Sequence, residues 1–358
     1  MKRILKRYLA VIMAVILTPV FIHGADHAVI IQYHNFGSGL APETSVTLER
    51  FKAHLEELKK NDSAVWPLSK IISNLREGES LPDMCVAITI DDAYRSLYEK
   101  AYPLLLKYRF PATVFVATES VDMNLETYLN WEQMREMSKN GITFESHSSS
   151  HAYLIRRKKD ESPADWEKRV REDITSSIER LESMLGKEVD LFAYPYGEYN
   201  PRLREIIKEL DLVAFGQHSG AVWRGSDFAA LPRFPVSGKY SEIESFRVKI
   251  RSFPLPVISE QPESPIIKAG SKPPALRLKL KAGDYISGSI ACYVSGQGKA
   301  DINWIDRENN IIEVSAEDNL PEGRSRYNIT ALHKDGSRYY WYSHLWITVP
   351  AEKDKEEE

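Results

Sequence analysis

Residues 85–92 read Cys-Val-Ala-Ile-Thr-Ile-Asp-Asp, a short apolar run that ends in two adjacent carboxylates. An apolar run of this length is typical of a buried strand. Neighbouring side chains of a strand point to opposite faces, so Asp91 and Asp92 can serve one site only if the strand stops there and the chain turns. Ala93, Tyr94 and the polar residues that follow favour such a turn.

Strand-like and helix-like segments alternate on both sides of this run. The longest helix is expected to start from Ser162 and Pro163 and to end at Gly186. Repeated strand–helix units predict a parallel sheet, either open or closed into a barrel. In such folds, functional residues gather where strands end and loops begin. Strands are expected at 28–33, 86–90, 112–117, 142–144, 189–194 and 212–215.

A histidine pair follows the strand expected at 142–144. His147 and His151 are separated by three serines, and a helical turn would bring two such histidines to one ion. Asp and paired His are suitable ligands for a zinc-like ion, and a second carboxylate beside that ion is a ready general base. Together with the Asp pair, the histidines suggest a metal-assisted hydrolase.

Each of these features also has a plainer explanation. The Asp pair could cap a helix, and the two histidines could be ordinary residues of a polar loop. Spacing alone is weak support, since His23 and His27 have the same spacing and straddle an expected cleavage site. The hypothesis of a metal site therefore depends on several features that occur together, each after an expected strand.

The first 25 residues are typical of a signal peptide. Basic residues precede an almost wholly apolar run from Tyr8 to Ile22, and Gly24 and Ala25 supply small residues near a cleavage point. We expect an exported protein, periplasmic or secreted, with no stable membrane span after cleavage; an uncleaved N-terminal anchor is the alternative. The net charge of −4, with acidic and basic residues interspersed, argues against nucleic acid as a partner.

The composition changes after residue 253. A high density of prolines predicts a linker at 256–274. Short alternating segments then predict a small all-β, sandwich-like domain at 275–350, and a charged tail follows at 351–358. The first domain is accordingly expected at 26–255. Cys85 and Cys292 are predicted to be buried free thiols rather than a disulfide.

Five short motifs resemble those of the polysaccharide deacetylases, the NodB-homology group or carbohydrate esterase family 4. Thr-Ile-Asp-Asp-Ala-Tyr at 89–94 is similar to the family's Thr-Phe-Asp-Asp-Gly motif. The segments 146–151 and 192–197 resemble its second and third motifs. Tyr-His at 33–34 and Leu-Pro-Arg-Phe at 231–234 resemble motifs of its exported, poly-N-acetylglucosamine-type branch.

This resemblance runs from about Val29 to Val236 and implies a distorted (β/α) barrel that removes N-acetyl groups from a glycan. Matched residue by residue, it implies one divalent metal, with zinc expected and cobalt, nickel or iron as alternatives. A bound ion of this kind polarises the acetyl carbonyl and activates water. The implied ligands are Asp92, His147 and His151, the implied general base is Asp91, and the implied oxyanion donor is the backbone N–H of Tyr196.

The sequence departs from the family pattern at several points. Ala93 stands where the family has Gly, and Ala193 stands where it has the Arg that tethers the base. Arg233 is the candidate replacement for that Arg. The motif that carries the general acid has no convincing match, and His218 is a candidate acid by residue type only. Further candidates for the substrate cleft are His34, Tyr94 and Trp223.

We therefore expect a metal-dependent hydrolase that removes N-acetyl groups from the N-acetylglucosamine units of a polysaccharide. The expected substrate is an exopolysaccharide, a chitin-like glycan or peptidoglycan. An O-acetyl esterase on the same scaffold and a non-catalytic glycan-binding protein are the alternatives, although a mere binder would not need Asp91 as a base. The aromatic residues between Tyr339 and Trp346 could stack on sugars, but at period two they more often feed a sandwich core.

Overall fold

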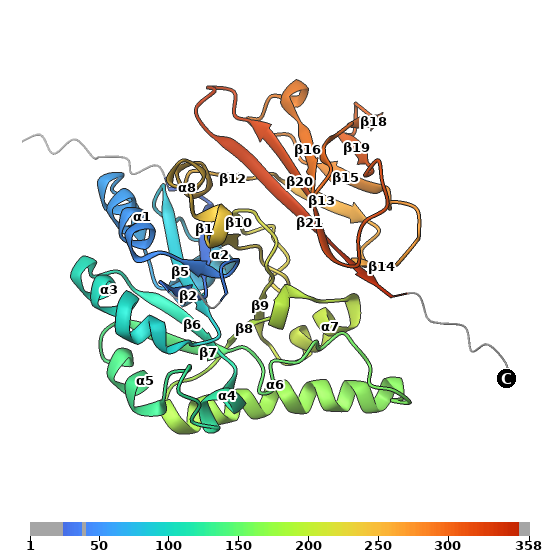
Figure 1. Cartoon of the computed structure of the whole chain (residues 1–358). Helices are drawn as coiled ribbons and strands as arrows, with labels where there is room; N and C mark the ends of the chain where they lie inside the picture. Colours follow the sequence, from blue (N-terminus) through green and yellow to red (C-terminus); the bar gives the residue numbers. More distant parts are fainter. Residues whose placement is uncertain (1–23, 38–40, 351–358) are drawn as a thin grey trace, which may run out of the picture.

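The computed structural model describes residues 24–37 and 41–350 of the chain. They form an N-terminal α/β part and a C-terminal all-β part that pack against each other (Figure 1). The charged tail and all but the last two residues of the expected signal peptide lie outside the described residues. Within them, no helix has the length and apolar character needed to cross a membrane.

Six parallel strands form the centre of the α/β part. Hydrogen bonding joins them in the order β1-β5-β6-β7-β8-β9. The carboxyl ends of all six therefore lie at one end of the sheet, which is where the motifs of the sequence fall. The strands are β1 (His27–Tyr33), β5 (Cys85–Asp91), β6 (Ala112–Val116), β7 (Ile142–Ser146), β8 (Leu191–Ala193) and β9 (Val213–Phe215).

The segment 231–235 connects the two outer strands of this sheet. Leu231 forms a parallel bridge to Phe215 at the end of β9, and β11 (Phe234–Pro235) pairs in parallel with β1. Gly216 N–H donates to the Leu231 carbonyl at 2.9 Å, which fixes the first of these contacts. The sheet therefore curls into a distorted barrel, and the predicted fold class is confirmed. Two short strands extend it, β4 (Ala64–Val65) beside β5 and β10 (Val222–Trp223) antiparallel to β1.

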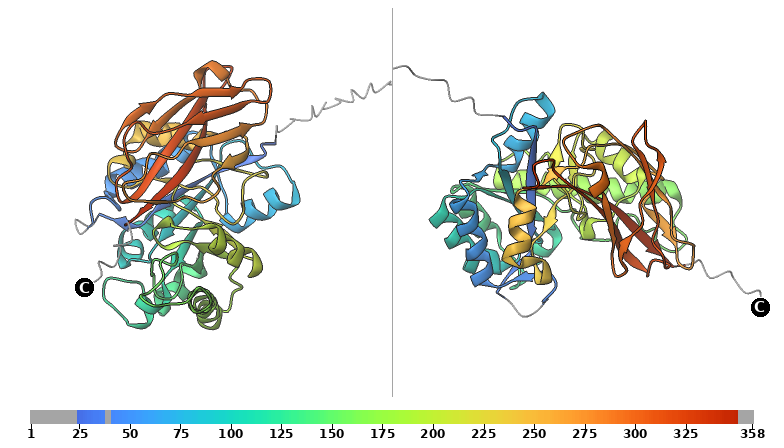
Figure 2. Two further views of the ribbon diagram at one scale, coloured as in Figure 1. Left: turned by 90° about the vertical axis from the view of Figure 1, so that its right-hand side faces the viewer. Right: turned by 90° about the horizontal axis from the view of Figure 1, so that it is seen from above.

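Helices surround the sheet in Figures 1 and 2. The predicted long helix is α6 (Pro163–Leu185), in which the Ser162 hydroxyl accepts from Asp165 N–H and Gly186 ends the helix with φ 65°. The others are α1 (Leu48–Lys60), α2 (Leu68–Glu77), α3 (Tyr102–Tyr108), α4 (Thr118–Asp122), α5 (Trp131–Ser138), α7 (Pro201–Glu209), α8 (Ile243–Ile250) and the short turns η1 (Leu97–Ala101), η2 (Pro195–Gly197) and η3 (Gly238–Ser241). A parallel pair of two-residue strands, β2 (Asn35–Phe36) and β3 (Ser45–Val46), lies beside them.

Alternation along β5 decides which of its side chains enter the barrel. Val86, Ile88 and Ile90 pack outward in the cluster that contains the apolar faces of α1, α3 and α5. The residues between them face inward, and Asp91 is the last of these. The strand thus delivers a carboxylate to the interior of the barrel at its carboxyl end.

The C-terminal part consists of two sheets that share one core of buried apolar side chains. This arrangement agrees with the sandwich-like domain that the sequence predicts. One sheet contains β12 (Phe253–Pro254), β14 (Ile266–Lys268), β16 (Ala291–Val294), β17 (Gly298–Ala300), β20 (Gly323–Leu332) and β21 (Tyr339–Val349). The other contains β13 (Val257–Gln261), β15 (Leu276–Leu280), β18 (Asn303–Asp306) and β19 (Ile311–Val314), and a turn η4 (Ser287–Ser289) precedes β16.

The predicted linker at 256–274 is not a linker. It contains β13, which pairs with β15, and β14, which pairs with β21, so most of it belongs to the two sheets. Its prolines lie before, between and after these strands rather than inside them, where proline would remove a hydrogen bond of the ladder. A high proline density here marks the ends of short strands. Cys85 and Cys292 are both buried and free, as predicted.

Candidate metal centre and catalytic site

The chain turns sharply at the end of β5. Asp91 is the last residue of the strand, and Asp92 and Ala93 follow with φ of 70° and 54°. This left-handed region is one that residues other than glycine adopt rarely. The turn removes Asp92 from the alternation of the strand, so Asp91 remains inside the barrel while Asp92 reaches the loop after β7.

Asp92, His147 and His151 meet at this end of the barrel. One ligand atom from each lies within 4.8 Å of the other two. Nε2 of His147 is 3.5 Å and Nε2 of His151 is 3.1 Å from Oδ1 of Asp92. The residues proposed from the sequence as ligands therefore converge, and one carboxylate with two imidazoles is a donor set that suits a zinc-like ion.

The surroundings of His147 favour a cation at this point. Its Nδ1 lies 2.7 Å from the backbone carbonyl of Ala193, and because a carbonyl only accepts, Nδ1 must donate. In the neutral ring, Nε2 then presents a lone pair toward the Asp92 carboxylate. That nitrogen is buried without a hydrogen-bond partner among the described residues. A metal ion would satisfy both groups, and the contact from Nδ1 is the outer contact that commonly orients a ligating histidine.

Asp91 is held by a different set of partners. Arg233 donates through Nη1 to Oδ1 at 2.7 Å and through Nη2 to Oδ2 at 2.8 Å. Gln32 donates to Oδ2 at 2.6 Å, and Nε2 of His34 lies 3.8 Å from the same oxygen. Arg233 is itself fixed by the carbonyl of Gly216 at 3.0 Å. Both charged side chains are fully buried, so the pair is oriented rigidly.

These partners keep Asp91 ionised. Burial alone would raise its pKa, but the opposing charge of Arg233, followed by those of His147 and His34, holds the pKa of Asp91 below its usual value. A buried carboxylate that stays charged can accept a proton. Oδ1 receives only one hydrogen bond within the described residues, which leaves acceptor capacity on that oxygen.

The turn after β8 lies beside the histidines. Tyr196 has φ 60° within η2, and its ring contacts that of His151 edge-on at 4.7 Å. Its other neighbour is Tyr153, whose ring stacks on it at 3.8 Å. The Tyr196 carbonyl accepts a hydrogen bond from Nη1 of Arg324, a residue of β20 in the C-terminal part. This backbone, proposed from the sequence as an oxyanion donor, therefore adjoins the candidate metal site.

The remaining candidates divide between two places. His34 lies near Asp91, and Tyr94 lies near Asp92, where burial and then the Asp92 charge raise the pKa of the Tyr94 hydroxyl. His218 and Trp223 are not brought to this site. They line a cavity between the two parts of the chain instead.

This placement does not support His218 as the general acid. Its ring lies against Tyr199, with 5.8 Å between centroids, and burial lowers its pKa to about 3, so near neutral pH the ring is the neutral imidazole rather than the imidazolium acid. Two residues of the site were missed from the sequence. Gln32 could have been found as a polar residue inside the apolar strand expected at 28–33, but no local signal marked Arg324.

Known proteins resemble a large part of this chain. A family model described as polysaccharide deacetylase matches residues 78–215. A poly-beta-1,6-N-acetyl-D-glucosamine N-deacetylase of Staphylococcus aureus is 30% identical over 199 residues, which are 54% of this chain and 68% of the relative. The chain belongs to the polysaccharide deacetylase family. A putative polysaccharide deacetylase of Bacillus subtilis, YxkH, is 28% identical over 212 residues, 58% of this chain and 71% of that protein.

Solved structures share the fold of this deacetylase. The Streptococcus pyogenes deacetylase PplD matches with a TM-score of 0.56 and 22% identity over 63% of this chain and 98% of its own. IcaB from Ammonifex degensii matches with a TM-score of 0.55 and 22% identity over 64% of this chain and 99% of its own. At these identities the likeness shows the fold, and more than a third of this chain lies outside it.

Proposed function

We propose that this chain is an exported, metal-dependent N-deacetylase that acts on N-acetylglucosamine units of a polysaccharide. The observation that carries the proposal is the cluster of Asp92, His147 and His151 beside a separately tethered Asp91. The printed name of the Staphylococcus relative supports a poly-N-acetylglucosamine as the first substrate to test.

Asp92, His147 and His151 would hold the ion, with zinc expected first and cobalt, nickel or iron as alternatives. When bound, such an ion supplies Lewis acidity to the acetyl carbonyl and lowers the pKa of water towards ~7. The chain's own residues supply the rest of the chemistry. Their work is to accept a proton, to stabilise the developing oxyanion and to return a proton to the amine.

Asp91 is proposed as the proton acceptor. It is adjacent to Asp92 in the chain but points into the barrel, where Arg233 and Gln32 orient it. The acceptor capacity of its Oδ1 would take the proton of the attacking water. Arg233 replaces the tethering Arg that is absent at Ala193, and this assignment is also part of the proposal.

Two further groups complete the proposed reaction. The backbone N–H of Tyr196 would donate to the tetrahedral oxyanion, a contact whose loss typically costs about 10²–10³ in rate. The leaving amine needs a proton, and we propose His34 as its donor because Nε2 of His34 lies 3.8 Å from Asp91, whereas His218 lies away from the site. Burial lowers the pKa of His34, and the charges of Asp91 and Asp92 oppose that shift. Tyr94 would line the sugar cleft beside Asp92.

The decisive experiment measures acetate release and metal content together. Wild type and Asp91→Asn are compared on N-acetylated β-1,6-linked glucosamine oligomers, with the exposed Asp318→Asn as a matched control. We expect Asp91→Asn to keep the ion and to lose turnover, whereas Asp318→Asn behaves as wild type. Loss of the ion in Asp91→Asn would mean that the roles of Asp91 and Asp92 are reversed, and full turnover would end the proposal of Asp91 as base.

The same assay distinguishes the proposed N-deacetylase from two alternative functions. Faster acetate release from O-acetylated than from N-acetylated oligosaccharides would favour an esterase. Binding of the oligomers by metal-loaded protein without any acetate release would favour a glycan-binding protein.

The location and domain organisation are also proposals. We propose cleavage of residues 1–25 during export, which mass spectrometry of the mature N-terminus would test. The sequence places the deacetylase domain at 26–255, but β12 (Phe253–Pro254) already pairs with β21, so we propose that the all-β domain begins at β12 rather than after a linker.

A further inference from the structure

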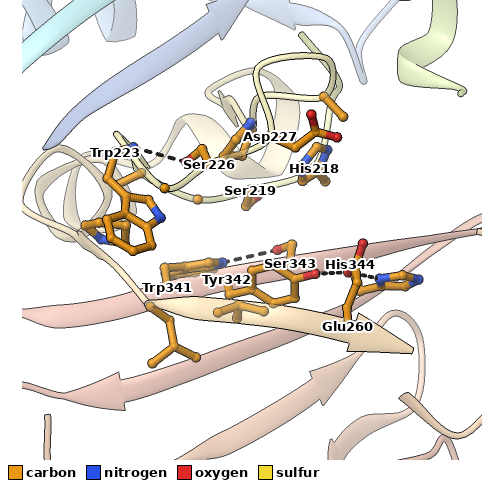
Figure 3. Close-up of a pocket in the computed structure, with 18 of the residues that line it drawn as sticks. His218, Ser219, Trp223, Ser226, Asp227, Glu260, Trp341, Tyr342, Ser343 and His344 are labelled. Carbon is orange, nitrogen blue, oxygen red and sulfur yellow. Dashed lines mark hydrogen bonds and ion pairs between the residues drawn. The ribbon is translucent and has the colours of Figure 1, made fainter. Parts of the chain in front are cut away.

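A cavity of about 190 Å³ lies between the deacetylase barrel and the all-β domain. It is smaller than the ~300–1,000 Å³ typical of sites for drug-sized ligands. In Figure 3, Trp223, His218 and Asp227 approach from the barrel, and Trp341, Tyr342 and Glu260 approach from the strands opposite.

One part of the cavity wall is aromatic. The Trp223 ring lies against Gly225, where a Cβ would stand 2.5 Å from the indole, so only glycine permits this ring position. Trp341 is fixed edge-on against Phe234 at 5.3 Å between centroids. Tyr342 is fixed by a hydrogen bond from its hydroxyl to Glu260. These rings are therefore held in place without a ligand.

The other part of the wall is polar and incompletely bonded. Oε2 of Glu260 accepts from Tyr342 and contacts Nδ1 of His344 at 2.9 Å, but no described residue donates to Oε1. Nδ1 of the buried His218 has no hydrogen-bond partner among the described residues. Buried polar groups are normally paired, and the His218 nitrogen is not, while Oε1 of Glu260 belongs to a half-buried side chain that the hydroxyl group of a ligand can reach.

The cavity is separate from the candidate catalytic centre. Neither the Asp pair nor His147 nor His151 lines it. Arg233 lies between the two places, because its backbone N–H donates to the carbonyl of His218 at 2.9 Å while its guanidinium holds Asp91. A ligand in the cavity would therefore be bound next to the barrel but away from the reacting acetyl group.

We propose that this cavity is a second glycan subsite, which takes one pyranose unit of the polysaccharide on which the centre acts. A pyranose ring presents C–H groups on its faces and hydroxyls around its edge. The faces suit the rings of Trp223 and Trp341, and the hydroxyls suit the free oxygen of Glu260 and the imidazole of His218. The proposal deepens the proposed function, on which it rests for the identity of the glycan.

The test uses the full chain freed of metal by a chelator, so that binding is measured without turnover. The probe is a β-1,6-linked N-acetylglucosamine pentasaccharide, titrated by calorimetry against wild type, Trp223→Ala and Glu260→Gln. Trp304→Ala is the matched control, because Trp304 is a half-buried indole of β18 that does not line the cavity. We expect affinity to fall roughly fivefold to tenfold in the two cavity variants and to stay within about twofold of wild type in the control.

A local measurement excludes a general loss of folding as the cause of a weaker affinity in the cavity variants. The pentasaccharide should protect the backbone amides of 218–227 and 257–260 from hydrogen exchange in wild type and not in Trp223→Ala. Wild-type affinity in both cavity variants, or protection confined to the loops after β5 and β7, would overturn the subsite. Binding that depends on Trp223 without acetate release from metal-loaded wild type would keep the subsite and overturn the proposed reaction instead.

Discussion

Arg233 and Asp91 form a two-point contact, with 2.7 Å from Nη1 to Oδ1 and 2.8 Å from Nη2 to Oδ2, inside the barrel. The two residues come from opposite sides of the closure, since Asp91 ends β5 and Arg233 lies in the segment 231–235 that joins β9 to β1. The same pair therefore orients the proposed base and ties the closing segment to the sheet. Stability and activity should respond to it together.

Replacing Arg233 should lower both the stability of the fold and the catalytic activity. In Arg233→Met, the Asp91 carboxylate is left buried and unpaired, and breaking a buried pair in this way typically lowers the free energy of unfolding by about 3–5 kcal/mol. Acetate release should also be lost, because Asp91 would no longer be held in position. Urea unfolding followed by circular dichroism measures the first effect, and an acetate assay measures the second.

A second substitution separates the two roles. Arg233→Met combined with Asp91→Asn removes the stranded charge, so the double variant should unfold at a higher urea concentration than Arg233→Met while it remains inactive. Arg277→Ala breaks an exposed pair with Glu313 and should cost no more than about 1 kcal/mol. If Arg233→Met costs no more than Arg277→Ala, the buried pair does not stabilise the barrel.

Metal removal should destabilise the deacetylase domain. A ligand that binds only the folded state stabilises it by mass action, about 2.7 kcal/mol when its free concentration is 100 times its Kd. We expect a chelator to lower the melting temperature and zinc to restore it. His147→Ala should bind less zinc and gain little from its addition.

His333→Ala is the control for this experiment, since His333 lies in the all-β domain and contacts Asp335. It should retain the metal content and the zinc-dependent shift of wild type. Equal zinc content in His147→Ala and wild type would contradict the proposed ligand set.

The parts of the fold and site that could be predicted are those that local sequence decides. The apolar run before Asp91 and the run before His147 mark strand ends, and parallel strands place their carboxyl ends together. The convergence of Asp92 with His147 follows from that rule. The long helix followed from Ser162, Pro163 and Gly186 because caps and breakers act locally.

The parts that could not be predicted depend on packing between distant segments. His218 and Trp223 follow or form strands, as the catalytic candidates do, yet the loop around them turns to the interface with the all-β domain. Prolines flank β13 and β14 at the same density that a linker would show. Arg324 lies more than a hundred residues after Tyr196, and only the packing of β20 against the barrel brings the two together.

The contact from Arg324 to the Tyr196 carbonyl predicts a catalytic role for the all-β domain. Arg324→Ala should leave the turn at 195–197 less rigidly placed, so kcat should fall by roughly tenfold, less than the 10²–10³ typical of losing an oxyanion donor itself. The KM and the free energy of unfolding should change little, because Arg324 is partly exposed and does not belong to the core. Steady-state kinetics on a soluble oligomer measures the split.

Arg324→Lys retains one donor and should recover part of the rate. Arg277→Ala, an arginine of the same domain that is far from the turn in sequence and bonded to Glu313, should keep the wild-type kcat. A fall in kcat of equal size in Arg277→Ala would show that the effect is a general one on the domain.

His54 predicts a loss of stability in mild acid. Its ring is fully buried, stacks on Phe246 at 4.1 Å and is bonded to the Tyr33 hydroxyl and the Ser241 carbonyl, each at 2.9 Å. Burial lowers the pKa of His54 from 6.5 to about 4. The folded state therefore disfavours the proton that the unfolded chain takes up at about pH 6.5.

The difference in the pKa of His54 between the folded and unfolded states decides how stability changes with pH. The contribution of His54 is complete above pH 6.5 and is lost as the pH falls from about 6.5 to 4, at ~1.4 kcal/mol per pKa unit, or roughly 3 kcal/mol in all. Urea unfolding at pH 7, 5.5 and 4.5 should show His54→Phe less stable than wild type at pH 7, with the gap closing as the pH falls. Tyr33→Phe keeps the imidazole, so its smaller deficit should persist at each pH. A constant gap between His54→Phe and wild type would mean that His54 does not contribute to the acid sensitivity.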